Sequence, residues 1–107
     1  MRNKRKVILS PTAQRQYLEI RDYLKSNWTE SVLEKFEDLM EQKINQVSEF
    51  PKSCPESKKK KGIHKAVVEK NNSFFFRIKK EHIQILIFID NRMDPNYAKK
   101  QLKNYGR

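Results

Sequence analysis

Apolar residues alternate with other residues between Ile63 and Pro95. Alternation with a period of two is typical of β-strands, because successive side chains point to opposite faces. The pattern places Phe74, Phe76 and Ile78 on one face of a strand. It places four isoleucines on one face of the next strand: Ile83, Ile85, Ile87 and Ile89. This stretch therefore predicts two long strands that pair as a hairpin.

A tight connection at Lys80-Glu81 would bring the two apolar faces together. The expected pairs are Ile78 with Ile83, Phe76 with Ile85, and Phe74 with Ile87. The opposite face of the hairpin would be apolar at one end and cationic at the other, which suits a partner or a second core. Its expected residues are Phe75, Arg77 and Lys79 on the first strand, and Gln84, Leu86 and Phe88 on the second.

The first half of the chain predicts a short strand, Lys6 to Leu9, and two helices. Ser10 is expected to cap the first helix and Pro11 to occupy its first position. Its buried stripe would be Ala13, Tyr17, Ile20 and Leu24, ending near Ser26-Asn27. Ser31 and Glu34 have the spacing of a capping box, which predicts that a second helix starts there and runs to Pro51. The short connection predicts an antiparallel helix pair, with Trp28 plugging its end.

A loop is predicted from Pro51 to Gly62, and it contains the run Lys58-Lys59-Lys60-Lys61. Another strand is predicted from Ile63 to Glu69, followed by a turn at Lys70-Asn71-Asn72. Asp94-Pro95 repeats the cap-plus-proline signal, so a short C-terminal helix could follow.

The resulting order is β-α-α-β-β-β, with a possible short C-terminal helix. We expect a single α+β domain over residues 1–107, in which a helix hairpin packs on one face of a mostly antiparallel four-stranded sheet.

The net charge of +11 lies almost wholly in the second half of the chain. Residues 51–107 contain fifteen Lys and Arg against five Asp and Glu, whereas residues 1–50 contain nine against eight. Such a field favours polyanionic partners, either nucleic acid or an acidic protein segment, although lysines can also serve only to solvate a surface. The lysine run could contact phosphates or simply be a solvated loop.

Cys54 is the single cysteine, so no disulfide is expected, and no stretch is long and apolar enough for a signal peptide or membrane span. We expect a cytoplasmic protein. His64 and His82 lack metal-ligand spacing, so neither a metal nor another cofactor is expected.

A few side chains on or beside the strands are candidates for binding. Arg92 follows the isoleucine strand and either contacts a target or forms a salt bridge with Asp90 or Asp94. His64, next to Lys65, is either a strand-edge histidine or a proton shuttle. Phe75 could be core, stack on a base or pack against a partner.

The order and spacing of several short motifs resemble the RelE/ParE family of toxins from type II toxin–antitoxin systems, and its ParE branch more than its RelE branch. These motifs are Val7-Ile8-Leu9-Ser10-Pro11 with Ala13, Leu18-x-Glu-Ile20-x-x-Tyr23-Leu24, Trp28 and Phe36, Phe50-Pro51, Gly62 leading into Val67-Val68, and Asp90-Asn91-Arg92 before Pro95.

The resemblance implies a toxin that is neutralised by a cognate antitoxin, whose acidic or amphipathic tail wraps the sheet and the helix hairpin. In the ParE branch the target is DNA gyrase, which is poisoned by binding. The residues expected to contact the target or the antitoxin are His64, Lys65, Phe75, Arg77, Lys79 and Arg92.

The RelE branch implies a different activity, metal-independent cleavage of messenger RNA on the ribosome. That chemistry needs cations around the developing charge and a proton donor. Lys65, Arg77, Arg92 and Tyr97 would supply them. However, Ser73-Phe74-Phe75-Phe76 stands where that branch has a tyrosine-arginine pair, and Tyr97 lies one residue short of the family's terminal tyrosine. A non-toxic relative that only binds its partner is the third possibility.

Overall fold

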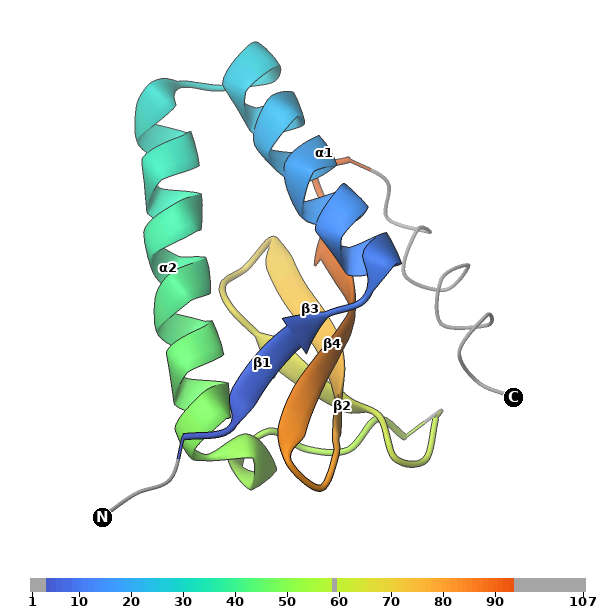
Figure 1. Ribbon diagram of the computed structural model, residues 1–107. Helices are drawn as coiled ribbons and strands as arrows, with labels where there is room; N and C mark the ends of the chain where they lie inside the picture. The colour runs from blue at the N-terminus through green and yellow to red at the C-terminus, as the bar shows by residue number, and fades with distance from the viewer. Residues whose placement is uncertain (1–3, 59, 94–107) are drawn as a thin grey trace.

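The computed structural model describes residues 4–58 and 60–93 and contains one sheet and two long helices (Figure 1). In chain order the elements are β1 (Lys6–Leu9), α1 (Pro11–Asn27), α2 (Glu30–Glu49), the 3-10 helix η1 (Pro51–Ser53), β2 (His64–Val67), β3 (Asn72–Ile78) and β4 (His82–Asp90). The predicted order β-α-α-β-β-β is confirmed. β2 is shorter than predicted at both ends, and the expected C-terminal helix lies outside the described residues.

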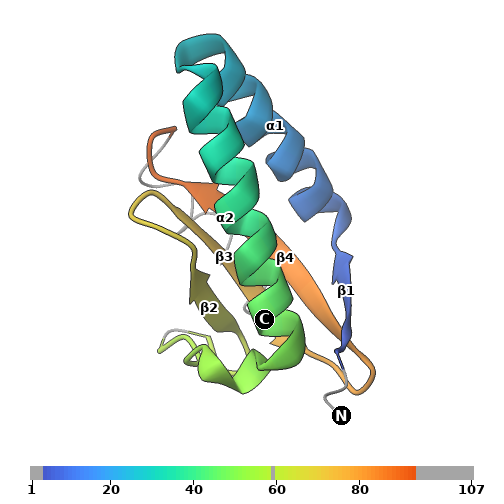
Figure 2. The same ribbon diagram turned by 90° about the vertical axis from the view of Figure 1, so that its left-hand side faces the viewer.

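The four strands form one sheet in the order β1-β4-β3-β2. β1 runs parallel to β4, while β4 with β3 and β3 with β2 are antiparallel. The α1–α2 hairpin covers one face of this sheet, as the two views in Figure 1 and Figure 2 show. The predicted two-layer α+β architecture is therefore correct.

The start of α1 follows the prediction. The Oγ of Ser10 accepts a hydrogen bond from the amide of Ala13 at 3.0 Å, and Pro11 occupies the first turn. Ala13, Ile20 and Leu24 are buried at helical spacing. This apolar stripe holds the helix on the sheet.

The start of α2 differs from the prediction. The helix begins at Glu30, and its cap is Thr29, whose Oγ1 accepts a hydrogen bond from the amide of Val32 at 3.3 Å. Ser31 lies inside the first turn, so the Ser31–Glu34 pattern is not the capping box. Only Trp28 and Thr29 separate the two helices, and the extended backbone of both residues leaves Thr29 in the capping position.

Trp28 does not plug the end of the helix pair. Its side chain is 48% exposed, and the guanidinium carbon of Arg92 lies 5.7 Å from the centre of its ring. The indole therefore stacks with a cation at the surface, in an arrangement typical of cation–π pairs.

The β3–β4 hairpin has the predicted tight turn, with the amide of Lys79 donating to the carbonyl of His82 at 2.8 Å. Ile78 pairs with Ile83 and Phe76 with Ile85, as predicted. Beyond these pairs the predicted register is wrong. Phe75 pairs with Ile87 and Phe74 with Phe88, because Leu86 is an extra residue that forms a β-bulge.

The bulge reverses the alternation of β4. Ile83, Ile85 and Phe88 face the helices, whereas Leu86, Ile87 and Ile89 belong to a second buried cluster. The four isoleucines therefore do not share a face, and Phe88 lies on the face opposite to the predicted one.

Contacts with α1 hold the bulge in place. The Oγ of Ser10 donates to the carbonyl of Leu86 at 2.8 Å, and the Oε1 of the buried Gln16 accepts from the amide of Phe88 at 2.9 Å. These bonds satisfy backbone groups that an extra residue removes from the ladder.

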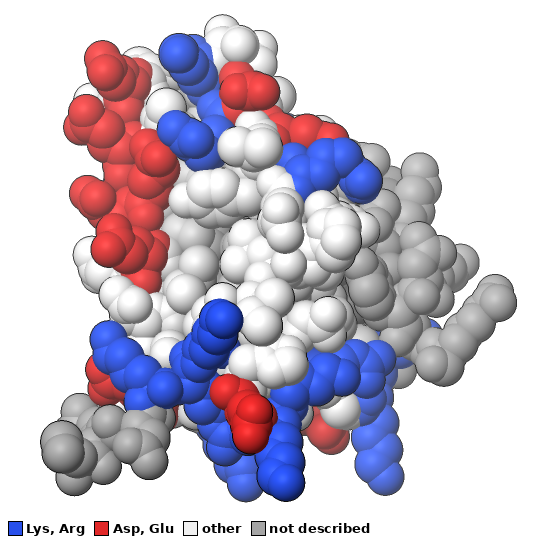
Figure 3. All heavy atoms as spheres, viewed as in Figure 1, with Lys and Arg blue, Asp and Glu red and all other residues white. Residues whose placement is uncertain are grey.

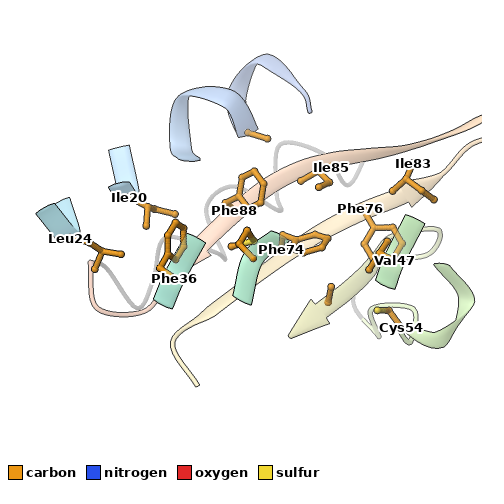
Figure 4. Packing of buried hydrophobic residues seen from close by; sticks show 13 residues of the cluster. Ile20, Leu24, Phe36, Val47, Cys54, Phe74, Phe76, Ile83, Ile85 and Phe88 are labelled. Carbon is orange, nitrogen blue, oxygen red and sulfur yellow. The ribbon is translucent and has the colours of Figure 1, made fainter. Parts of the chain in front are cut away.

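The main core fills the space between the helices and the sheet (Figure 4). Phe74 contacts both Phe76 and Phe88, with ring centres 5.9 and 5.7 Å apart, and Tyr17 packs on Phe36 and Phe88. Burial is the main cause that raises the pKa of Tyr17, so its phenol stays neutral. A second cluster lies beyond the sheet and consists of Ile63, Phe75, Leu86, Ile87 and Ile89.

Replacement of Ser10 by Ala should destabilise the protein more than replacement of Thr29 by Ala. Both changes remove a helix cap, which costs ~1 kcal/mol. The first also leaves the carbonyl of Leu86 without its Ser10 partner, which adds ~1 to 3 kcal/mol. Urea unfolding of the two variants measures the difference. Equal losses would show that the Ser10–Leu86 bond contributes nothing to stability.

Candidate cationic sheet surface and Arg92 cluster

The sequence-predicted site residues fall into two groups at different places on the sheet. Lys65 pairs with Phe75, and Phe75 pairs with Ile87. Asp90, the last residue of β4 and the ion-pair partner of Arg92, lies three residues beyond Ile87, which corresponds to ~10 Å along the strand. Arg77 lies five residues after Asn72 on β3, and Asn72 pairs with Asp90, so Arg77 is ~17 Å from the Arg92–Asp90 pair. Lys65 and Arg77 therefore belong to one region and Arg92 to another.

Lys65, Phe75 and Arg77 share the sheet face opposite the helices. Phe74 and Phe76 point into the main core, so the residues between and after them point away from it. The Nζ of the exposed Lys65 lies 5.9 Å from the centre of the Phe75 ring. Phe75 itself is only 5% exposed. Its side chain supports the lysine stem, and direct stacking on a base would require its ring to become exposed.

His64 lies on the other face of the sheet, toward the helices. Its ring stacks on Phe76 with centroids 5.3 Å apart. The Nδ1 atom is 2.9 Å from the carbonyl oxygen of Cys54, and because a carbonyl only accepts, this nitrogen carries the proton. Cys54 is buried in the main core. The structure therefore separates His64 from its sequence neighbour Lys65 by the thickness of the sheet.

Arg92 forms a network with Asp90 and Asn72 at the end of β4. Its Nε and NH2 atoms donate to the two carboxylate oxygens of Asp90 at 3.0 and 2.6 Å. NH2 also donates to the Oδ1 of Asn72 at 3.1 Å, and the Nδ2 of Asn72 donates to Asp90 at 2.8 Å. Of the two sequence interpretations of Arg92, the structure shows the salt bridge to Asp90.

The same arginine joins three parts of the fold. Glu69, in the β2–β3 turn, lies 4.0 Å from its NH2 atom, and the hydroxyl of Tyr23 on α1 donates to its carbonyl at 3.2 Å. The hydrogen bond to Asp90 is the main cause that raises the pKa of the guanidinium, which is therefore charged at every accessible pH. The side chain of Asp90 is fully covered, and that of Arg92 is 13% exposed. Arg92 thus links the end of β4, through Asp90, to α1, through Tyr23.

Lys79 is exposed in the β3–β4 turn, at the end of the sheet away from Arg92. The NH1 atom of Arg5 donates to the carbonyls of Lys79 and Lys80 at 2.7 and 3.4 Å, so the N-terminal segment fixes this turn. Figure 3 shows blue side chains along the lower edge of the molecule and red ones over α2. On this face of the molecule, most of the positive charge at the lower edge is thus separated from the negative charge on α2.

Sequence reasoning missed the supporting residues Asn72, Glu69 and Arg5. Asn72 is buried at the start of β3 and needs a hydrogen-bond partner, but the identity of that partner, Asp90, depends on the β3–β4 register. Tyr97, the predicted proton donor, lies outside the described residues.

Within residues 4–58 and 60–93, no group of three or more His, Cys, Asp or Glu side chains could hold a metal ion. No helix in this part of the chain has the length and apolar character that crossing a membrane requires.

The sequence pattern of the ParE toxins of type II toxin–antitoxin systems (parDE) matches residues 7–95, which include both helices and all of the sheet except Lys6. The chain belongs to the ParE toxin family. Curated protein sequences give no significant match.

Solved structures share the fold of this ParE-family chain. A chain of the chromosomal ParDE toxin–antitoxin system from Pseudomonas aeruginosa has 21% identity and a TM-score of 0.67, covering 82% of this chain and 97% of that one. The conserved protein HP0894 from Helicobacter pylori has 15% identity and a TM-score of 0.56, covering 82% and 96%. A chain of the Escherichia coli DinJ–YafQ toxin–antitoxin complex has 15% identity and a TM-score of 0.51, covering 83% and 94%.

Replacement of Arg92 by Ala in this ParE-family protein should cost ~3 to 5 kcal/mol of unfolding free energy, because it leaves the covered carboxylate of Asp90 without its cation. The matched control is Arg15→Ala, which breaks an exposed pair with Glu19 and should cost less than ~1 kcal/mol. Denaturant unfolding measures both.

A double variant, Asp90→Ala with Arg92→Ala, separates pairing from simple loss of packing. Its loss should be smaller than the sum of the two single losses by more than ~1 kcal/mol. Additive losses would show that Asp90 and Arg92 do not stabilise each other, and would leave Arg92 available for contact with a target.

Proposed function

We propose that this ParE-family toxin inhibits DNA gyrase by binding to it and performs no covalent chemistry. The observation that carries the proposal is the separation of the cations that RNA cleavage would need in one place. Lys65 and Arg77 lie on one region of the sheet, and the Arg92–Asp90 pair lies ~10 Å or more away along the strands.

Cleavage of RNA by its own 2′-hydroxyl requires cations within contact distance of one phosphate and a proton donor beside the leaving oxygen. An arginine that donates to both oxygens of a covered carboxylate has its charge largely neutralised. His64 cannot take over proton transfer beside Lys65, because its ring lies on the other face of the sheet. These contacts favour inhibition by binding over a RelE-like ribonuclease.

The proposed contact surface for gyrase is the sheet face opposite the helices, near Lys65 and Arg77. Lys65 is exposed on the edge strand β2, and Arg77 is half-buried on β3. Lys79 extends the same cationic region toward the β3–β4 turn. Rigid strands position these side chains more accurately than a loop would.

We also propose that a cognate antitoxin covers the toxin. Leu18 and Trp28 are 56% and 48% exposed on α1 and at its end, and Val67 is 56% exposed on β2. Exposed hydrophobic side chains of this size are suited to an amphipathic segment. The net charge of +11 adds an attraction for acidic residues of such a segment.

The decisive experiment applies the same purified protein to a gyrase supercoiling assay and to a translation assay that maps cuts in ribosome-bound message. We expect supercoiling to be inhibited and message to remain intact. Message cleavage with gyrase unaffected would overturn the proposal and favour the RelE-like ribonuclease. Absence of both effects would favour a relative that only binds its partner.

Replacement of Lys65 by Gln should weaken inhibition of supercoiling about tenfold, because it removes one exposed charge from the proposed contact surface without a change in the core. The matched control is Lys35→Gln on α2, which removes the same charge from an exposed position on the helix layer. Equal inhibition by the two variants would exclude Lys65 from the contact.

A further inference from the structure

The sheet topology gathers three basic segments that are far apart in the sequence. β1 is parallel to β4, so the start of β1 and the β3–β4 turn lie at the same end of the sheet. β2 is antiparallel to β3, so the loop that enters β2 also lies at that end. We call this group the lysine edge. It consists of Lys6, Lys58, Lys60, Lys61, Lys79 and Lys80.

The loop that carries three of these lysines is anchored at its base. The amide of Lys65 donates to the carbonyl of Pro55 at 3.1 Å, and the amide of Ser57 donates to the carbonyl of Ile63 at 2.6 Å. Glu56 forms a bridge with His64, and its Oε1 accepts from the amide of Gly62 at 2.9 Å. The loop therefore continues the sheet beyond β2 as a small hairpin and presents its lysines at a fixed place.

The ammonium groups of the lysine edge are not neutralised within the part of the chain that the structure describes. None of the six lysines forms an ion pair there, in contrast to Arg15, Arg21 and Arg92. Five of the six are exposed and Lys60 is partly exposed. Figure 3 shows that blue side chains predominate along the lower edge of the molecule, with red ones among them.

We propose that the lysine edge binds the sugar-phosphate backbone of duplex DNA, without reading its sequence. Lysine is a compact point charge suited to phosphate contacts, and such contacts carry affinity and not base specificity. β1 and β2, the outer strands, are separated by three strand spacings, or ~14 Å. That span is close to the ~12 Å width of the major groove, so lysines from both sides can reach the two flanking backbones.

An acidic protein segment fits this edge less well. Protein partners rely on large apolar anchors at the centre of an interface. Four of the six exposed large hydrophobic residues in the described chain lie on α1 or toward the opposite end of the sheet: Leu18, Trp28, Val67 and Met93. The choice of DNA over RNA rests on the proposed function, because gyrase holds a DNA duplex as its substrate.

The test compares two triple variants with equal net charge. The first, Lys61→Gln, Lys79→Gln and Lys80→Gln, removes three exposed charges from the lysine edge. The control, Lys25→Gln, Lys35→Gln and Lys70→Gln, removes three exposed charges from the helices and from the turn at the other end of the sheet. Circular dichroism establishes that both variants are folded.

Fluorescence anisotropy with a labelled 30-base-pair duplex gives the affinity of each full-length variant over a range of salt concentrations. Each lost phosphate contact lowers the slope of log affinity against log salt by ~0.9. We expect the slope to fall by ~2 to 3 for the lysine-edge variant and by less than ~1 for the control. Equal changes in both variants would show only an effect of net charge and would overturn the proposal.

Two further outcomes would also overturn it. One is absence of duplex binding by the unaltered protein at low salt. The other is tighter binding of single-stranded RNA or polyglutamate than of the duplex, which would assign the lysine edge to RNA or to an acidic protein segment.

A supercoiling assay on the same proteins distinguishes this inference from the proposed function. Gyrase inhibition without duplex binding would overturn the DNA contact alone. Duplex binding through the lysine edge without gyrase inhibition would overturn the proposed function and leave the DNA contact standing.

Discussion

The β-bulge at Leu86 is the constraint on which the rest of this structure depends. β4 is central in the sheet and is buried on both faces, so the side of every residue after the bulge depends on one extra position. The bulge turns Phe88 toward the helices and turns Ile87 and Ile89 into the second cluster. Ser10 holds it, and the same side chain caps α1. Strand alternation and helix position are therefore fixed by one set of hydrogen bonds.

The two ends of β4 carry charges of different kinds. At its start, the turn with Lys79 and Lys80 places exposed cations beside those of the loop before β2. At its end, Asp90 and Arg92 neutralise each other and connect the sheet to α1 through Tyr23. One cationic region is thus available for recognition while the other stabilises the fold. This division supports the proposed inhibition by binding, because Lys65 and Arg92 do not meet at one place among the residues that the structure describes.

Local sequence patterns sufficed for the elements and much of the pairing. The Ser10-Pro11 cap, the helical stripes and the pairs Ile78–Ile83 and Phe76–Ile85 follow from spacing alone. The bulge does not, because it depends on Ser10 and Gln16 reaching backbone groups more than 70 residues away. The face on which His64 lies follows from the pairing of β2 with β3, which local patterns do not give. The salt bridge of Arg92 could not be predicted either, because it depends on the contact between Asn72 and Asp90. The cap at Thr29 shows that a matching pattern at Ser31 can be outweighed by helix geometry.

Titration of a fixed concentration of gyrase with the toxin tests the central claim, inhibition by binding, most directly. Supercoiling activity would be measured at several gyrase concentrations. The account predicts that the toxin concentration at half-inhibition rises in proportion to gyrase when gyrase exceeds the dissociation constant, because each inhibited enzyme retains a toxin molecule. Inactivation of a large excess of gyrase by a trace of toxin, increasing with time, would contradict it and indicate turnover.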